Sequence, residues 1–257
     1  MVPRQPVDGG ATPLCRPGRV ADFARAGDGR AMTNGTPQKL AVAVGASARV
    51  AALLTLPPQP RACFIFAHGA GAGMTHAFMA AVAEGLAERG VATLRYQFPY
   101  MEKAGKRPDP PAVAHAAVRG AVAVAAEHCP GMPLIAGGKS FGARMTSQAQ
   151  AKAPLAGVQG LAFFGFPLHP AGKPSSDRAD HLADVKIPML FLQGTGDKLA
   201  ELDLLKPVVR KLGARATLHL VEGADHSFHV PKRSGRNDSE VMVEVLDTFV
   251  AWVARFS

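Results

Sequence analysis

From about residue 38 onward, short runs rich in β-branched and aromatic residues alternate with longer Ala-rich stretches. Such alternation is typical of an α/β domain, in which helices cover both faces of a mostly parallel sheet. No helical stretch separates the first two runs, so we expect them to form an antiparallel hairpin at one edge of the sheet. We expect strands at about 38–44, 50–56, 62–67, 91–97, 133–137, 158–166, 187–193 and 215–221, and helices near 75–89, 111–128, 141–152, 199–212 and 239–255.

Residues 1–35 show no sustained helical or strand period, and we expect them to be a disordered leader. A second methionine, Met32, is an alternative start of translation. The remaining residues, 36–257, are enough for one α/β domain with a full core. Only residues 167–186 separate the sixth expected strand from the seventh, so we expect no helical lid domain.

The formal net charge of +9 raises the question of a nucleic-acid or membrane partner. Most basic residues are scattered along the chain, and 2 Tyr and 1 Trp offer few rings on which bases could stack. The two local basic clusters are Lys103/Lys106/Arg107 and Lys232/Arg233/Arg236. A solvated basic surface is the simpler interpretation, and we expect neither nucleic acid nor membrane as a partner.

The cysteines Cys15, Cys63 and Cys129 are odd in number and lack C-x-x-C spacing, which favours neither a disulfide framework nor a zinc site. No apolar run approaches the roughly 18 residues of a membrane span, and no secretory signal is recognisable. We therefore expect a cytoplasmic protein without a bound metal. The sequence leaves its oligomeric state open.

One segment combines a strand, a tight turn and a helix around a serine. The apolar run that begins at Leu134 leads into Gly138-Lys139-Ser140-Phe141-Gly142, and a helical stretch follows. This is the G-x-S-x-G pattern in the strand-to-helix context that a nucleophilic serine requires. Glycines stand two residues before and two residues after Ser140, because larger side chains there would clash across the bend.

A base and an acid stand at the matching ends of later strands. His226 follows the last expected strand, and Asp197 follows the strand before it. The chain order Ser140, Asp197, His226 is the order of the triad in an α/β-hydrolase. His229, three residues past His226, is the one rival base.

The same chemistry needs two backbone N–H groups aimed at a developing oxyanion. Phe141, directly after the nucleophile, should supply one of them. The glycine-rich loop after the third expected strand should supply the other, from Ala70 as first choice or Gly71 as second. We expect His68 to order this loop.

Simpler roles exist for each residue alone, since a serine between glycines is often a turn and an aspartate after a strand is often a helix cap. Four features stand at the strand ends where a hydrolase needs them, and together they favour catalysis: the turn at Ser140, Asp197, His226 and the glycine-rich loop.

A phosphate loop is excluded because Pro133 stands where its leading glycine should be. A dinucleotide site is excluded because the glycine spacing and the acid for a ribose are both absent.

Six stretches carry a family resemblance: AHGAGAGM (67–74), RYQFPYME (95–102), GGKSFGARM (137–145), GFPLHPAGKP (165–174), LFLQGTGDKL (190–199) and GADHSF (223–228). They resemble the dienelactone-hydrolase-like members of the α/β-hydrolase superfamily, including the animal testis-expressed and nonspecific-lethal-complex relatives. The resemblance implies a triad at Ser140, Asp197 and His226 and no cofactor. Dienelactone hydrolases proper carry a cysteine nucleophile where this chain has Ser140, so dienelactone is not the expected substrate.

We therefore expect a serine hydrolase that cleaves a small ester, thioester or lactone through an acyl-enzyme on Ser140. The alternative is a catalytically silent hydrolase-fold interaction module. The basic clusters should rim the site, and Lys232 and Arg233 are the candidate contacts to a negatively charged substrate. A basic rim that serves only solubility is the simpler explanation of the same residues.

Overall fold

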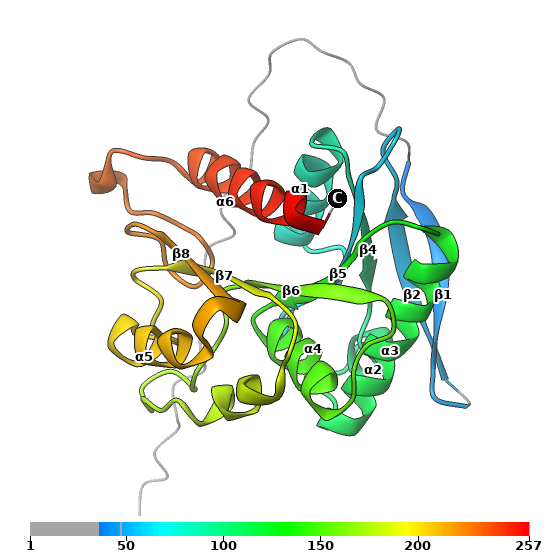
Figure 1. Ribbon diagram of the computed structural model, residues 1–257, viewed down its shortest axis with the longest axis horizontal. Coiled ribbons are helices and arrows are strands. Elements are labelled where there is room, and N and C mark those ends of the chain that lie inside the picture. Colours follow the sequence, from blue (N-terminus) through cyan, green and yellow to red (C-terminus); the bar gives the residue numbers. More distant parts are fainter. Residues whose placement is uncertain (1–35, 47, 257) are drawn as a thin grey trace, which may run out of the picture.

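The structure is a computed structural model that describes residues 36–46 and 48–256. A single sheet with strand order β1-β2-β4-β3-β5-β6-β7-β8 forms its centre (Figure 1). The strands are β1 (Gln38–Val44), β2 (Ala48–Thr55), β3 (Ala62–Ala67), β4 (Val91–Tyr96), β5 (Leu134–Lys139), β6 (Val158–Phe164), β7 (Met189–Gly194) and β8 (Ala216–Val221). The β1–β2 and β2–β4 pairs are antiparallel, and the pairs from β4 to β8 are parallel.

Helices cover both faces of the sheet, with α1 and α6 on one face and α3, α4 and α5 on the other (Figure 1). The α-helices are α1 (Ala77–Glu88), α2 (Pro99–Glu102), α3 (Pro111–His128), α4 (Phe141–Lys152), α5 (Leu202–Leu212) and α6 (Asp238–Val253). Short 3₁₀ segments are η1 (Asp177–Asp184), η2 (Gly213–Arg215), η3 (Lys232–Ser234) and η4 (Ala254–Phe256). Among the described residues, no helix has both the length and the apolar character needed to cross a membrane.

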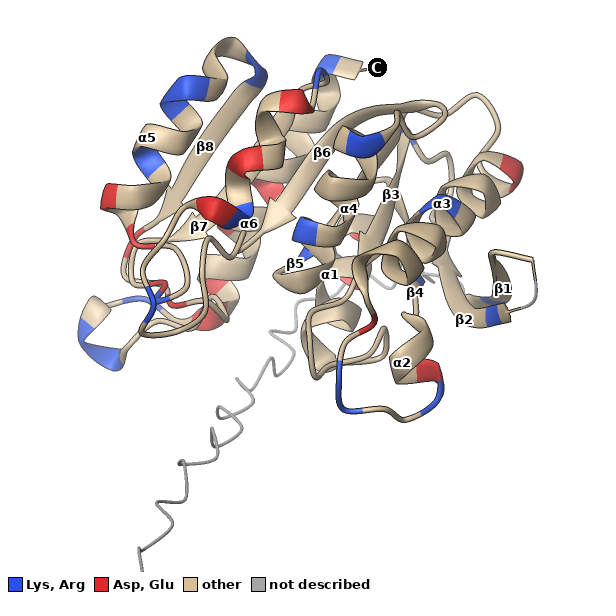
Figure 2. Cartoon of the chain, turned by 90° about the horizontal axis from the view of Figure 1, so that it is seen from below, with Lys and Arg blue, Asp and Glu red and all other residues tan. Residues whose placement is uncertain are grey.

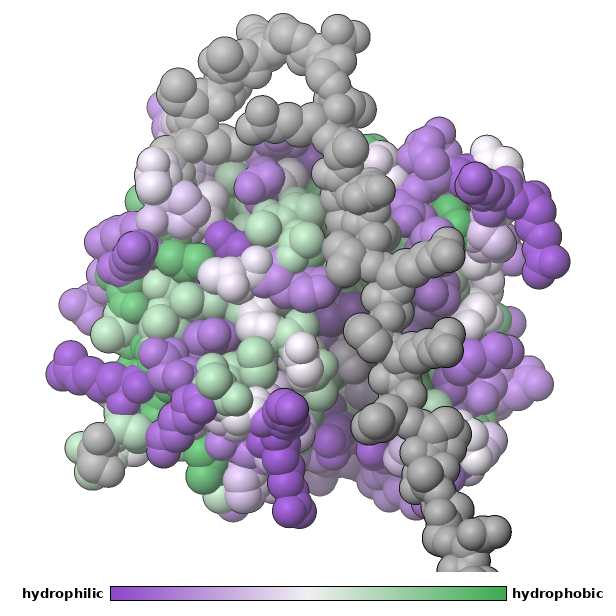
Figure 3. Space-filling view, turned by 180° about the vertical axis from the view of Figure 1, so that it is seen from behind, coloured by the Kyte–Doolittle hydropathy of each residue, from purple (hydrophilic) through white to green (hydrophobic). Residues whose placement is uncertain are grey.

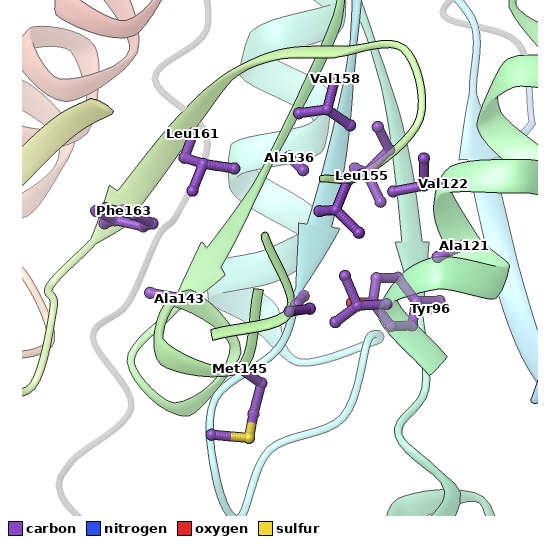
Figure 4. Close-up of a cluster of buried hydrophobic side chains, with 14 of the residues drawn as sticks. Tyr96, Ala121, Val122, Ala136, Ala143, Met145, Leu155, Val158, Leu161 and Phe163 are labelled. Carbon is purple, nitrogen blue, oxygen red and sulfur yellow. The ribbon is translucent and has the colours of Figure 1, made fainter. Parts of the chain in front are cut away.

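The sheet separates two apolar layers. Strands β3 and β4 are buried along their whole lengths, as the central strands of a parallel sheet covered on both faces should be. On the α3/α4 side, Tyr96, Val122, Leu161 and Phe163 are among the side chains that pack together (Figure 4). On the α1/α6 side the layer is rich in phenylalanine, and the Phe64 ring lies 4.8 Å from that of Phe249. Both layers therefore hold the central strands firmly in place.

The expected α/β fold, the antiparallel β1–β2 hairpin and the absence of a large lid are confirmed. The helical segments α2 and η1 are among those that were not expected. Segment α2 has only 4 residues, too few to show a helical period, and η1 lies inside the segment 167–186, which we expected to be too short for a helical lid domain. The expected leader, Met32 and Cys15 lie outside the described residues, while Cys63 and Cys129 are buried free thiols.

Helix α3 approaches the edge strand β1 so closely that a side chain cannot fit between them. A Cβ added to Gly120 would lie 2.0 Å from the carbonyl oxygen of Ala43 and 2.8 Å from a methyl carbon of Val42. Gly120 therefore sets the distance between this helix and the end of the sheet.

We predict that Gly120→Ala lowers the free energy of unfolding by about 1–3 kcal/mol, because the added methyl group must push α3 away from β1. This loss should outweigh the roughly 1 kcal/mol by which alanine favours a helix over glycine. Urea unfolding followed by circular dichroism measures it. Ala123→Ser, at an exposed position of the same helix, is the control. Equal stability of Gly120→Ala and wild type would show that this contact is not tight.

Candidate active site

Ser140 occupies the turn between β5 and α4 in a backbone conformation that residues other than glycine rarely adopt. Its backbone has φ 51° and ψ −110°. The turn also lies against the end of β3, because a Cβ on either Gly138 or Gly142 would come within 2.5 Å of the carbonyl oxygen of Ala67. Only glycine fits at these two positions, and the turn presents the Ser140 side chain at the carboxyl end of the sheet.

A continuous chain of hydrogen bonds joins Ser140, His226 and Asp197. The Nε2 atom of His226 lies 2.8 Å from the Ser140 Oγ, and its Nδ1 lies 2.6 Å from the Asp197 Oδ2. The three residues come from the loops after β5, β8 and β7, whose parallel strands end at the same edge of the sheet. The structure thus brings together the three residues that the sequence nominated.

Asp197 is buried and receives further hydrogen bonds. The backbone N–H of Leu199 donates to its Oδ1 at 2.8 Å, and the side-chain amide of Gln193 donates to its Oδ2 at 2.5 Å. Gln193 is itself buried in β7 and accepts a hydrogen bond from the Phe166 N–H at 2.9 Å. The sequence analysis did not single out Gln193, although a glutamine at the end of an apolar strand was a usable signal.

The two titratable partners are held in the protonation states that proton transfer needs. Burial lowers the pKa of His226 below its ordinary value, and the charge of Lys139 lowers it further. Burial alone would raise the pKa of Asp197, but hydrogen bonds from His226 and Leu199 and the charge of Lys139 hold it below its usual range. At neutral pH the pair therefore consists of a neutral imidazole and a carboxylate.

Lys139, beside the nucleophile, is enclosed rather than extended into solvent. Its ammonium group donates a hydrogen bond to the carbonyl oxygen of His226 and lies over the rings of Phe78 and Phe228, at 5.8 and 5.5 Å from their centroids. Burial lowers its pKa to about 8. The sequence analysis named Lys139 only as part of the turn around Ser140 and gave it no role, because its contacts come from distant parts of the chain.

The loop after β3 lies beside Ser140, and the hydrogen bonds of His68 hold it in place. This buried imidazole donates from Nδ1 to the Gly69 carbonyl at 2.8 Å and accepts at Nε2 from the Phe98 N–H at 3.0 Å. Burial lowers its pKa to about 4, so it stays neutral and keeps this tautomer. The expectation that His68 orders the loop is confirmed. Gly71 has a φ of 77°, which favours glycine.

A cavity of about 370 Å³ opens beside Ser140. Its wall includes Ala70 and Phe141, the two residues expected first as oxyanion donors. Phe141 is the first residue of α4, so its N–H has no partner within the helix. The cavity is also lined by Pro108, Asp109, Pro111, Arg144, Met145, Pro167, His169, Pro170, Arg178 and Leu199.

The rival base and the expected substrate contacts lie elsewhere. His229 is exposed and pairs with Asp238 at 2.8 Å, which raises its pKa. Lys232 and Arg233 lie exposed on η3 and do not line the cavity beside Ser140. Figure 2 shows basic segments (blue) on this stretch before α6 and on the loop after α2. A role for Lys232 and Arg233 in substrate binding stays a prediction.

The described residues contain no group of three or more His, Cys, Asp or Glu side chains that could hold a metal ion. The face seen in Figure 3 mixes hydrophilic (purple) and hydrophobic (green) side chains wherever the grey atoms leave it visible. On that visible part of the surface no broad apolar area is exposed.

Solved structures share this arrangement of sheet and helices. A dienelactone hydrolase from Anabaena variabilis superposes with a TM-score of 0.68 at 21% sequence identity, covering 86% of this chain and 99% of that one. XC6422 from Xanthomonas campestris, described as an α/β serine hydrolase without a lid, gives 0.65 at 19% identity, covering 84% and 95%. Est1E from Butyrivibrio proteoclasticus, with ferulic acid bound, gives 0.64 at 17% identity, covering 84% and 99%.

At these identities the structural matches show a shared fold. The sequence itself matches a protein-family model described as an alpha/beta hydrolase domain. The match covers residues 60–254, which is most of the chain. The matched range contains Ser140, Asp197 and His226. The chain therefore belongs to the alpha/beta hydrolase domain family.

Proposed function

We propose that the protein is a serine ester hydrolase that works through an acyl-enzyme on Ser140. The observation that carries this proposal is the hydrogen-bond chain from the Ser140 Oγ through the His226 imidazole to the buried Asp197 carboxylate. This arrangement matches the three roles of a nucleophile, a general base and a group that orients the base. The membership of the α/β-hydrolase family supports the same reaction class.

In the first half of the reaction His226 Nε2 takes the proton of the Ser140 hydroxyl while Oγ attacks the ester carbonyl carbon. The carbonyl oxygen becomes an oxyanion, which the N–H groups of Phe141 and of Ala70 or Gly71 stabilise. The imidazolium then returns the proton to the departing alcohol, and an acyl-Ser140 ester remains. A water molecule activated by His226 repeats these steps, releases the acid and restores Ser140.

Asp197 keeps the Nδ1–H tautomer of His226 and stabilises the imidazolium that forms during each proton transfer. Gln193 and Leu199 fix the carboxylate itself. Lys139 holds the loop of His226 through the carbonyl of that residue, and its charge opposes protonation of the imidazole before the substrate arrives. Lys139 is thus a positioning residue, because it acts through His226.

Small esters, thioesters and lactones are the substrates that we propose. The cavity is open, and within residues 36–46 and 48–256 no large lid encloses it to form a channel for a long acyl chain. We also propose, from the six matching stretches, kinship with the animal testis-expressed and nonspecific-lethal-complex proteins, and a cytoplasmic location. The catalytically silent interaction module remains the competing function, and labelling of the serine separates the two.

We predict that wild-type protein reacts with a fluorophosphonate probe and hydrolyses p-nitrophenyl acetate, whereas Ser140→Ala does neither. Loss of the nucleophile should reduce kcat by at least about 10³-fold, because substrate binding and the oxyanion donors alone leave only a small residual rate. His226→Ala should behave similarly. His229→Ala is the matched control and should keep most of its activity, since His229 pairs with Asp238. A folded wild-type protein that never labels would favour the interaction module.

We predict that kcat/KM falls on the acidic side with an apparent pKa below the ordinary value for histidine, because His226 must be neutral to act as a base. Lys139→Met removes a charge that lowers the pKa of His226, so this acidic limb should move to higher pH. Lys139→Arg keeps the charge and should leave the limb near its original position. A pH–rate profile of each protein measures the shift. An unmoved limb in Lys139→Met would show that Lys139 has no electrostatic influence on the base.

We predict that kcat/KM is highest for short acyl esters. A p-nitrophenyl ester series from acetate to decanoate measures the preference, because an open cavity can bury only a limited length of acyl chain. A steep rise toward the long chains would contradict the proposed open site.

A further inference from the structure

Two arginines beside Ser140 differ from the other enclosed arginines of the described chain. Arg144 and Arg178 are half-buried, yet neither donates a hydrogen bond or forms an ion pair with any described residue. The remaining buried or half-buried arginines all donate hydrogen bonds to carbonyl or carboxylate oxygens: Arg89, Arg95, Arg119, Arg215 and Arg236. Enclosed guanidinium groups are normally paired, so this exception needs a physical reason.

Both unpaired arginines line the cavity that contains Ser140. Arg144 lies four residues after Ser140, which places the two on the same side of α4, about one turn apart. Its guanidinium packs over the Phe141 ring at 5.8 Å from the centroid, and its Nε is buried without a partner. Arg178 comes from η1, which lies between β6 and β7.

The wall around the pair leaves its charge uncompensated. Burial lowers the pKa of both arginines, and Arg178 lowers that of Arg144 further, which shows that the two cations repel each other. Asp109, the one acidic side chain that lines this cavity, accepts a hydrogen bond from the Tyr100 N–H at 2.9 Å. The acidic residues of η1 are exposed and pair with neither arginine.

We propose that Arg144 and Arg178 together bind a carboxylate group of the substrate, so that the enzyme acts on esters that carry one free carboxylate. The planar guanidinium forks match a carboxylate in geometry, and an anion placed between them removes their mutual repulsion. This proposal rests on the proposed hydrolysis at Ser140.

The geometry also sets where the carboxylate lies along the substrate. The four residues from Ser140 to Arg144 correspond to a rise of about 6 Å along the helix axis, so the anion should stand several bonds from the carbonyl carbon that Ser140 attacks. A six-carbon diacid half-ester has this spacing. The carboxylate can belong to the acyl part or to the alcohol part of the ester, and both have to be tried.

The test compares matched pairs of substrates. For the acyl side, p-nitrophenyl hydrogen adipate is compared with its neutral methyl ester. For the alcohol side, 4-acetoxybenzoate is compared with methyl 4-acetoxybenzoate. Wild-type kcat/KM should favour the anionic member of at least one pair, and Arg144→Met or Arg178→Met should reduce that preference by about tenfold or more through loss of a charge-assisted hydrogen bond. Activity on the neutral members should persist, which shows that both variants fold.

Arg210→Met, which removes an exposed arginine of α5 far from the cavity wall, is the matched control and should keep the wild-type preference. Arg144→Lys keeps the charge without the planar fork and should retain part of the preference. The proposal is overturned if wild type shows no preference for either anionic ester. It is also overturned if the preference survives in both methionine variants but disappears in Lys232→Ala/Arg233→Ala, because recognition would then lie on η3.

A binding measurement separates this proposal from the proposed function. Ser140→Ala, titrated calorimetrically with monomethyl adipate and with dimethyl adipate, should bind the anionic ester more tightly, and Arg178→Met added to Ser140→Ala should abolish the difference. Such binding by a protein whose wild type hydrolyses no ester would leave the anion site standing and refute the hydrolase. Hydrolysis of both members of each pair at equal rates would support the hydrolase and refute the carboxylate site.

Discussion

The strained turn at Ser140 is the constraint on which the rest of the site depends. Gly138 and Gly142 let the turn lie directly against the end of β3, so Ser140 is held at the ends of the two central strands of the sheet. Neither β3 nor β5 can shift without opening the apolar layers on both faces. The energy needed to keep a serine at positive φ is thus supplied by the packing of the whole sheet.

The parallel order of the strands explains why residues distant in sequence meet at this turn. Strands β5, β7 and β8 end at one edge, and the loops that follow them carry Ser140, Asp197 and His226. Each loop is then fixed by its own contacts. The Asp225 carboxylate accepts hydrogen bonds from the N–H groups of Ser227 and His229, which shapes the loop around His226. Topology brings the groups together, and local hydrogen bonds set their distances.

The same division decides what could be predicted from the sequence. Strand positions, the placement of Ser140, Asp197 and His226 after successive strands and the contact of His68 with its own loop all follow from local patterns, and the structure places these residues as expected. The sequence analysis did not identify the roles of Gln193 and Lys139, because hydrogen-bond partners of both residues lie far away in the sequence. The position of Arg144 beside the site could have been predicted from the sequence, since it lies about one helical turn after Ser140. The position of Arg178 could not have been predicted, because η1 has no regular period that would indicate a helical segment beside the cavity.

The positive groups around Ser140 act in different ways because they differ in access to solvent and substrate. Lys139 is closed off by Phe78 and Phe228, so its charge reaches Asp197 and His226 with little screening and adjusts the base. Arg144 and Arg178 face an open cavity, where a bound carboxylate would take the place of water. The exposed lysines and arginines of η3 and of the loop after α2 are screened by salt within about 8 Å at physiological ionic strength. We therefore expect charge to attract an anionic ligand more strongly at the cavity wall than at the outer rim.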